Sequence, residues 1–346
     1  MSDATQVPDL GELTVDCSTM PAIRAFEGWD DRAWVRTGQH AGRSAPGAGA
    51  QFFPHHLVPH AHHPHVLARP ESDRHYLMAQ HLFQWLTFTV HFELSVVNRA
   101  TLMIADGSSG VTIPDLAKST AYQIYIDEGY HSLQSLRVRQ QIEQSSAIPA
   151  LPYDFGRFLR RLDAIGEERP GHTHLLRLLQ VVVFETLVTS IFADVPADPA
   201  VLPVVRRLVA EHAVDERRHH AFFASFFWSL WGALDARYRR LVAEWLPELV
   251  LHCLQPATRP ALDALLAVGM PLPLAEEVIA ESYDRSAVHA YIRSAARKTL
   301  KLFENLGVMD LPGSRERFYE LGLLVEGSPA SATPVARLSV ESPLPG

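Results

Sequence analysis

The chain has 346 residues, of which 47% are hydrophobic and 20% are charged. This composition is ordinary for a globular protein, and it excludes a collagen, a coiled-coil rod and a fully disordered chain. The formal net charge of −8 argues against a nucleic acid or an anionic membrane surface as a partner, because both attract a basic face.

Cysteine content and apolar runs bear on the compartment. Cys17 and Cys253 cannot form a disulfide framework, which fits a reducing cytosol. The first ten residues lack the basic and apolar regions of a signal peptide. No run of about 18 apolar residues is found, so no transmembrane helix is predicted. We therefore expect a cytoplasmic protein.

Residues 1–70 are rich in proline, glycine and histidine and show no sustained periodicity. They predict an irregular arm with one short helix around residues 21–29. A histidine-rich tract, HHLVPHAHHPH, occupies residues 55–65, and such tracts can bind metal. Because prolines interrupt it and oppose helical ligand spacing, we interpret it as a plain loop, with metal binding as the alternative. These prolines are Pro54, Pro59 and Pro64.

Residues 71–326 predict a helical body, because apolar residues recur there at helical spacing. A capping signature at 112–115 and Gly107 mark helix ends. Four long helices are expected at about 72–106, 115–144, 172–194 and 198–234. Shorter helices are expected at about 154–168, 235–254, 257–267, 274–281, 285–306 and 314–324. The chain is thus predicted to be all-α, with a disordered Ser/Pro-rich tail at 327–346.

Two of the long helices each carry one isolated glutamate. In LLQVVVFETLVTSIFAD, Glu185 is the only ionisable side chain between Arg177 and Asp194. Glu93 lies in the same way at the centre of LFQWLTFTVHFELSVVN. A helix that is apolar all round is buried, and a buried carboxylate is costly unless it is paired or binds metal. The alternative for each is an ion pair with a buried arginine or lysine.

The other two long helices each contain D-E-x-x-H. One reads Asp127-Glu128-Gly-Tyr-His131 and the other Asp215-Glu216-Arg-Arg-His219. Glutamate and histidine three residues apart share one helix face. Glutamate, E-x-x-H, glutamate, E-x-x-H in this order is typical of the di-iron or di-manganese site of a four-helix bundle. The oxygen-rich ligand set favours iron or manganese over zinc.

His212 is a further candidate ligand. It lies four residues before Glu216 and seven before His219, so the three share one helical stripe. His220 lies about 80° round the helix from His212, whereas His219 lies about 20° from it, so His220 is the poorer choice. The alternative for His212 is a core histidine that bonds to the backbone.

With these residues, the sequence resembles the AurF-type arylamine N-oxygenases, which are non-haem di-iron enzymes of natural-product biosynthesis. The resemblance covers about residues 70–310, and in that family a histidine stands where His212 stands here. It implies a ferritin-like four-helix bundle with additional C-terminal helices. It also implies seven metal ligands: Glu93, Glu128, His131, Glu185, His212, Glu216 and His219.

The resemblance further implies that Glu128 and Glu216 bridge two iron ions, for which manganese could substitute. One ion is completed by Glu93 and His131, and the other by Glu185, His212 and His219. The family oxidises an aromatic amine with O₂ to hydroxylamine, nitroso and nitro products, as in antibiotic biosynthesis. Electrons are expected from an external donor, because no G-x-G-x-x-G follows a predicted strand. We also expect a homodimer.

Two other functions remain open. An acyl-carrier desaturase or hydroxylase would use the same ligands without His212, and the string DERRH resembles the second E-x-x-H motif of desaturases. The first motif here is DEGYH, however, and His212 has no role in such an enzyme. Ferritin-like iron storage needs a small shell-forming subunit, whereas this chain is about twice that size.

Residues around the ligands carry weaker predictions. We expect Asp127 to bond His219 and Asp215 to bond His131, because metal-bound histidines donate their other ring N–H to a carboxylate. The alternative is that both aspartates are solvated or pair with nearby arginines. Arg293 or Arg297 is a candidate anchor for a substrate carboxylate, with a solvated basic helix face as the alternative. Three aromatic residues next to ligands are expected to pack in the core or line a pocket: Phe92, Tyr130 and Phe184.

Overall fold

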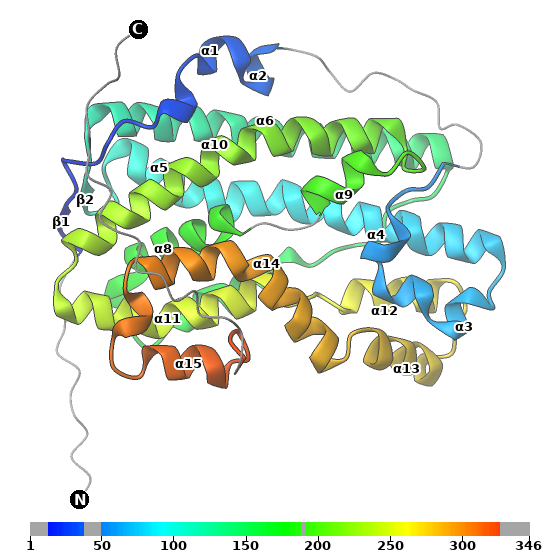
Figure 1. The fold of residues 1–346 in the computed structure, drawn as a ribbon. Helices are drawn as coiled ribbons and strands as arrows, with labels where there is room; N and C mark the ends of the chain where they lie inside the picture. Colours follow the sequence, from blue (N-terminus) through cyan, green and yellow to red (C-terminus); the bar gives the residue numbers. More distant parts are fainter. Residues whose placement is uncertain (1–12, 38–49, 188–190, 326–346) are drawn as a thin grey trace, which may run out of the picture.

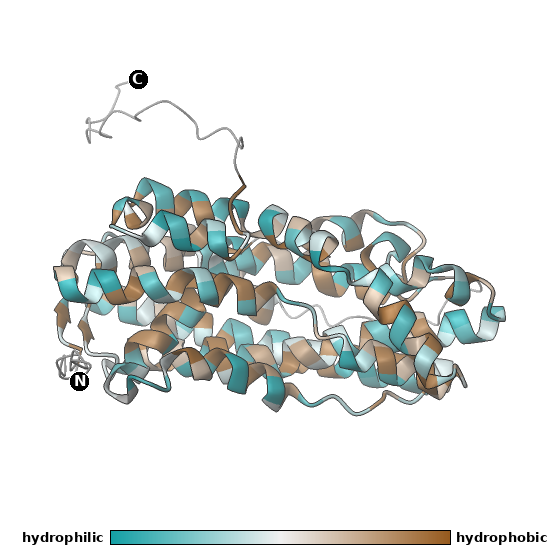
Figure 2. Ribbon diagram, turned by 90° about the horizontal axis from the view of Figure 1, so that it is seen from below, coloured by the Kyte–Doolittle hydropathy of each residue, from teal (hydrophilic) through white to brown (hydrophobic). Residues whose placement is uncertain are grey.

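The computed structural model describes residues 13–37, 50–187 and 191–325. These residues form a bundle of helices with one short pair of strands, so the all-α prediction is confirmed (Figure 1). The predicted disordered tail, 327–346, lies outside the described residues. Most helices in view carry polar and apolar residues side by side, as expected for helices that bury one face (Figure 2).

The first long helix is interrupted at a candidate ligand. It begins after Pro70 as α4, Glu71–Phe92, and continues as α5, Asn98–Asp106. Between them Glu93–Val97 forms a π-helical turn. Gly107 ends the helix in the left-handed conformation, with φ of 82°. The position of the helix agrees with the prediction, whereas the π turn at Glu93 had no signal in the sequence. Such turns frequently occur at functional sites.

The second long helix follows the sequence pattern, whereas the fourth begins five residues after the predicted start at residue 198. Helix α6, Asp115–Ser146, begins directly after Pro114. Helix α10, Pro203–Ala233, has proline in its first turn, where the missing N–H costs nothing. The two helices run side by side across the bundle (Figure 1).

The third long helix is shorter than predicted. Helix α8, Thr173–Thr186, ends because Leu187 takes extended backbone angles, φ −72° and ψ 144°. A separate helix, α9, Ile191–Ala197, follows and packs on α10. The prediction of one helix over 172–194 was therefore wrong. The sequence TLVTS at 186–190 contains three β-branched residues and a serine, which are weak helix formers.

The remaining helices cover the bundle on the side of α8. Helix α11, Ala236–Leu254, packs against α8, α14 and α15 (Figure 1). Asp235 caps α11 and Asp284 caps α14 through their side chains. The other elements are α7, Phe155–Asp163, α12, Arg259–Ala267, α13, Leu272–Ser282, α14, Arg285–Asn305, and α15, Ser314–Glu320.

The N-terminal arm is more ordered than the sequence suggested. Strand β1, Val15–Asp16, pairs in parallel with β2, Val111–Thr112. Two short helices follow, α1, Trp29–Arg32, and α2, Trp34–Thr37. Trp29, Trp34 and Phe53 are buried against the bundle. The division of the chain into an arm at 1–70 and a helical body at 71–326 stays a prediction.

The histidine-rich tract is also helical rather than a plain loop. It forms two 3₁₀ turns, His55–Leu57 and Pro59–His62, and the short helix α3, Pro64–Leu67. The interpretation as a loop was wrong because Pro59 and Pro64 occupy first-turn positions, where proline favours a helical start.

One stretch, Thr173–Ala197, is long and apolar enough to cross a membrane by length and composition alone. The sequence reading had expected none. It spans α8 and α9, and 67% of its apolar window is buried inside the structure, which is also the property of a core helix.

Candidate metal centre

Four helical segments bring the seven predicted ligands together in the middle of the bundle. Glu93 lies on the π turn and Glu185 near the end of α8. Helix α6 contributes Glu128 and His131, and α10 contributes His212, Glu216 and His219. All are buried except Glu216, whose side chain is 20% exposed. The exposed part of Glu216 faces a cavity that is described below.

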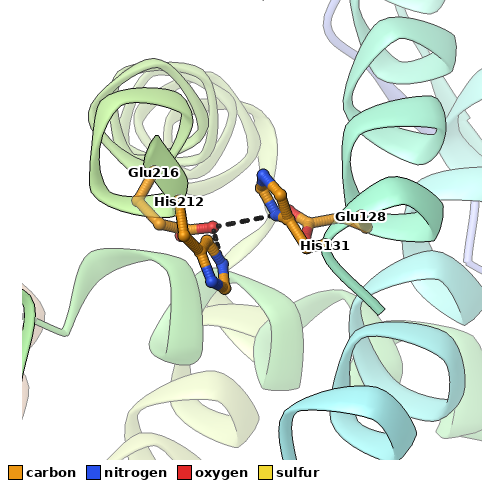
Figure 3. Close-up of side chains that lie close together, drawn as sticks. All are labelled: Glu128, His131, His212 and Glu216. Atoms are coloured by element: carbon orange, nitrogen blue, oxygen red, sulfur yellow. Dashed lines mark hydrogen bonds and ion pairs between the residues drawn. The ribbon is translucent and has the colours of Figure 1, made fainter. Parts of the chain in front are cut away.

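Six of the seven residues fall into two overlapping groups of donor atoms, and Glu93 belongs to neither. Glu128, His131, His212 and Glu216 form one group, and Glu128, Glu185, Glu216 and His219 form the other. Within each group the ligand atoms lie within 4.8 Å of one another. The first group is drawn in Figure 3, where side chains of α6 and α10 point toward each other. Since both groups share Glu128 and Glu216, two ions bound there would be bridged by these carboxylates.

The distances around the shared carboxylates are short. His131 Nδ1 lies 2.9 Å from Glu128 Oε2 and 3.7 Å from Glu216 Oε1. His219 Nδ1 lies 2.6 Å from Glu128 Oε1 and 3.5 Å from Glu216 Oε1. Glu185 Oε2 lies 4.0 Å from His219 Nδ1. Both E-x-x-H histidines thus turn Nδ1 inward.

His212 lies on the side opposite to that implied by the resemblance. Its Nε2 is 2.9 Å from Glu216 Oε1 and 3.6 Å from Glu93 Oε1. Its ring centroid is 3.9 Å from that of His131. His212 is therefore grouped with His131 and Glu93, not with Glu185 and His219. The reason is that His212 and His219 lie on opposite sides of Glu216 along α10, about 6 Å and about 4.5 Å away at 1.5 Å per residue.

The two aspartates make the crossed contacts. Asp127 Oδ2 lies 3.3 Å from His219 Nε2, and Asp215 Oδ2 lies 3.1 Å from His131 Nε2. Each histidine thus has one nitrogen directed at the centre and the other at an aspartate, which fixes its ring. Asp215 also accepts a hydrogen bond from Arg218. For Asp215, the predicted contact with His131 and the alternative contact with an arginine are therefore both present.

The N-terminal arm contributes residues that the sequence reading missed. Trp29 donates from Nε1 to Asp127 Oδ2 at 2.8 Å, and this contact is buried. Phe26 stacks on His219 with ring centroids 6.3 Å apart, and the ring centroids of Trp34 and His131 are 6.1 Å apart. These three residues lie in the segment FEGWDDRAW, at 26–34. Its cluster of aromatic residues, within a region rich in proline and glycine, could have indicated that this segment packs on the helices.

Electrostatics oppose full ionisation of the ligand carboxylates in the protein without metal. Burial and repulsion from Glu128 raise the pKa of Glu93 well above its usual range. Burial and the charge of Glu216 raise the pKa of Glu185 likewise. Burial also opposes the charge on Glu128, but the nearby His219 and His131 outweigh it and lower the pKa of Glu128. Metal binding would therefore displace protons from Glu93 and Glu185.

These residues fit a pair of divalent metal ions. Glu185 Oε2 is buried without a hydrogen-bond partner, and Glu128 Oε1 and His219 Nδ1, which lie 2.6 Å apart, have none beyond each other. Such atoms are rare in proteins and fit a metal ion as the partner. The four glutamates carry a formal charge of −4 when ionised, which balances two divalent cations. An oxygen-rich set with imidazoles suits iron or manganese.

A cavity of about 510 Å³ opens onto the centre. Its walls include Glu93, Glu185, His212 and Glu216 of the ligand set. Leu187, Ile191 and Phe192, on both sides of the break after α8, also line it. The end of α8 at Leu187 and the first residues of α9 therefore shape the approach to the metal centre. Further aromatic walls are Phe88, Phe92, Phe158 and Phe184.

The predicted substrate anchors are not brought to this cavity. Arg293 donates to the carbonyl of Gly322 at 3.0 Å, and Arg297 is exposed. Neither lines the cavity, whereas Phe92 and Phe184 do. Tyr130 packs against Trp34 instead, with ring centroids 5.2 Å apart.

The histidine-rich tract makes no additional metal group among the described residues. Its side chains contact neighbours instead. His60 Nδ1 lies 2.8 Å from the hydroxyl of Tyr283, and His63 Nε2 lies 3.0 Å from Glu281. His56 Nε2 lies 3.1 Å from Asp194.

Comparison with known proteins agrees with this geometry. No curated protein matches the chain. One family model, described as P-aminobenzoate N-oxygenase AurF, matches residues 23–307. The match starts well before residue 70, so it includes the part of the arm that carries Trp29 and Trp34. Because it covers most of the sequence, the chain belongs to the AurF family of p-aminobenzoate N-oxygenases.

Proposed function

We propose that the protein is a di-iron N-oxygenase that uses O₂ to oxidise an arylamine. The observation that carries the proposal is the pair of overlapping donor groups, which share Glu128 and Glu216 and open onto an aromatic cavity. The membership in the AurF family supports the same reaction class. We infer that the products are the hydroxylamine, the nitroso compound and finally the nitro compound.

The seven ligand residues, which include Glu128 and Glu216, would hold two iron ions, which supply O₂ activation when bound. The protein residues do the rest. Asp127 and Asp215 hold the rings of His219 and His131 in one tautomer, so that Nδ1 faces the centre. The phenylalanines of the cavity exclude water and guide the aryl ring. The amine then points at the end formed by Glu93, Glu185 and Glu216.

The wider role follows from the family. We infer a place in natural-product biosynthesis, such as that of an antibiotic, with a reductase or a reduced small molecule as electron donor. Cytoplasmic localisation and a homodimer are part of the same proposal. Manganese could replace iron, because both accept carboxylate and imidazole ligands.

The test combines metal content with turnover. The purified protein is loaded anaerobically with Fe(II), washed and analysed for iron, then given O₂, reductant and a panel of arylamines. We expect about two iron ions per chain and products that gain oxygen, read by mass spectrometry. Iron uptake that rises far beyond two would favour storage. Two irons with no arylamine oxidation, but with oxidation of an acyl chain, would favour the desaturase or hydroxylase class.

A further inference from the structure

Helix α4 and the π turn that follows it line the cavity from His81 to Glu93. His81, Gln84, Trp85, Phe88, Thr89, Phe92 and Glu93 all line it. Their spacing of three and four residues places them on one helix face. From His81 to Glu93 the helix rises about 18 Å, at 1.5 Å per residue. The cavity thus has a metal end at Glu93 and a far end at His81.

The size of the cavity exceeds that of a single substituted ring. An apolar cavity of about 150 Å³ is large enough to bind benzene. The cavity here measures about 510 Å³, so it has room for roughly three times that ligand. A ligand that fills it would be elongated along α4 and would reach from the metal end to the far end.

No lysine or arginine is among the described residues that line the cavity. Residues 188–190, between the lining residues Leu187 and Ile191, are valine, threonine and serine. Arg161 lies behind one wall, where it donates to the carbonyls of His252 and Gln255 and stacks over Phe158 at 5.5 Å. At the end away from the metal centre, a carboxylate would lose water without a lysine or arginine among the described lining residues to pair with it.

The far end offers neutral hydrogen-bonding groups instead. Tyr283 lines the cavity, and its hydroxyl is held by His60 at 2.8 Å. The ring of His81 packs against Phe53 with centroids 5.1 Å apart. Burial lowers the pKa of His81 to about 4, so this ring is neutral at pH 7. Gln84, one helical turn closer to the metal end, can both donate and accept.

We propose that the substrate is an elongated, uncharged arylamine whose end opposite the amine carries a hydrogen-bonding group such as an amide, a carbonyl or a hydroxyl. His81, Gln84 and Tyr283 bind that group, and the substrate is not a short aminobenzoate anion. This rests on the proposed N-oxygenase function. Burial of an ionised carboxylate without a partner is far more costly than burial of an amide that is hydrogen-bonded.

The test uses two matched pairs of probes. The short pair is para-aminobenzamide and para-aminobenzoate, and the long pair is the corresponding aminobiphenyl carboxamide and carboxylate. Binding to the iron-loaded protein is measured by calorimetry without O₂, and turnover is measured separately with O₂ and reductant. We expect the long amide to bind at least about tenfold more tightly than the long carboxylate, which corresponds to a difference of RT ln 10 in binding free energy. Both short probes should bind more weakly than the long amide.

Two variants of one residue sharpen the result. Gln84→Met keeps the size of the side chain and removes its polar group, so the long amide should bind several-fold more weakly. Gln84→Arg adds the missing cation, so the preference should invert toward the long carboxylate. Arg161→Met is the control and should leave both preferences unchanged, because its guanidinium bonds to backbone behind the wall.

Equal or tighter binding of the carboxylates overturns this inference, and so does a failure of all four probes to bind. If Arg161→Met then abolishes carboxylate binding, Arg161 is the anchor. Oxidation with a preference for carboxylates contradicts the substrate class but keeps the N-oxygenase function. Selective binding of the amides without oxidation contradicts the function and keeps the chemistry of the cavity.

Discussion

The two D-E-x-x-H segments have the same motif in different surroundings. On α6, Asp127 accepts a bond from the neutral indole of Trp29, and its Oδ1 has no hydrogen-bond partner. On α10, Asp215 uses one oxygen for His131 and the other for the guanidinium of Arg218. One aspartate is thus held by a dipole from the N-terminal arm, and the other by a charge from its own helix.

This difference divides the centre into unlike halves. Arg218 offsets the charge of Asp215, so Asp215 polarises His131 less than Asp127 polarises His219. The half that contains His131 has the additional imidazole of His212, whereas the half that contains His219 has Phe26 stacked on its ring. A pair of similar motifs therefore gives two metal positions that we expect to differ in affinity and reactivity.

Removal of a shared carboxylate should have the largest effect, and it should be similar for both motifs. Glu128→Ala and Glu216→Ala should each lose both metal ions, because each side chain belongs to both donor groups. Glu93→Ala should retain about one ion, since Glu93 approaches only the side of His212. Iron analysis after anaerobic loading measures this. Two irons and normal turnover in Glu216→Ala would contradict the assignment of the centre.

Removal of His212 tests what the extra imidazole adds to one half. His212→Ala should retain the helix and melt near the wild-type temperature, but it should lose or alter nitro formation. The pKa of His212 is lowered by burial and by the charge of His131, so it is available as a neutral ligand. Circular dichroism and product analysis give the two readouts, with the exposed His174→Ala as control. Full nitro formation would return His212 to a structural role.

The donor set could be predicted because it depends only on helical spacing. Glu128 and His131, or Glu216 and His219, must share a face on any regular helix, and an isolated Glu93 or Glu185 must be buried. The side on which His212 lies was predicted wrongly, because the family analogy placed it with Glu185 and His219, whereas it is grouped with His131.

The shape of the cavity could not be predicted, because it depends on departures from regular helices. The π turn at Glu93 and the extended Leu187 have no strong local signal, and tertiary packing decides them. The contact between Trp29 and Asp127 joins residues 98 positions apart, so no periodicity reveals it. That Arg293 and Arg297 do not line the cavity could not be predicted for a similar reason. The sequence shows that a helix face is basic, but it does not show which other element that face packs against.

The aspartates should separate metal affinity from stability. Asp127→Asn and Asp215→Asn should each lower metal affinity or activity about 10–100-fold. Only Asp215→Asn should also lower the melting temperature clearly, because it leaves the buried charge of Arg218 without its partner. Competition with a chelator gives the affinities, and thermal unfolding of the metal-free proteins gives the stabilities. Equal loss of stability in both variants would mean that the two halves are held alike.

The smallest effect tests whether the N-terminal arm acts on the centre through one hydrogen bond. Trp29→Phe removes the indole N–H that Asp127 accepts, which should cost about 1.5–3 kcal/mol for a bond to a charged group. Trp231→Phe is the matched control, because Trp231 is equally buried and donates at the same 2.8 Å, but to the carbonyl of Leu306 far from the ligands. Both variants should melt at a lower temperature, and only Trp29→Phe should weaken metal binding, mainly at the half that contains His219. If the two variants bind metal equally well, the arm supports the fold and not the metal centre.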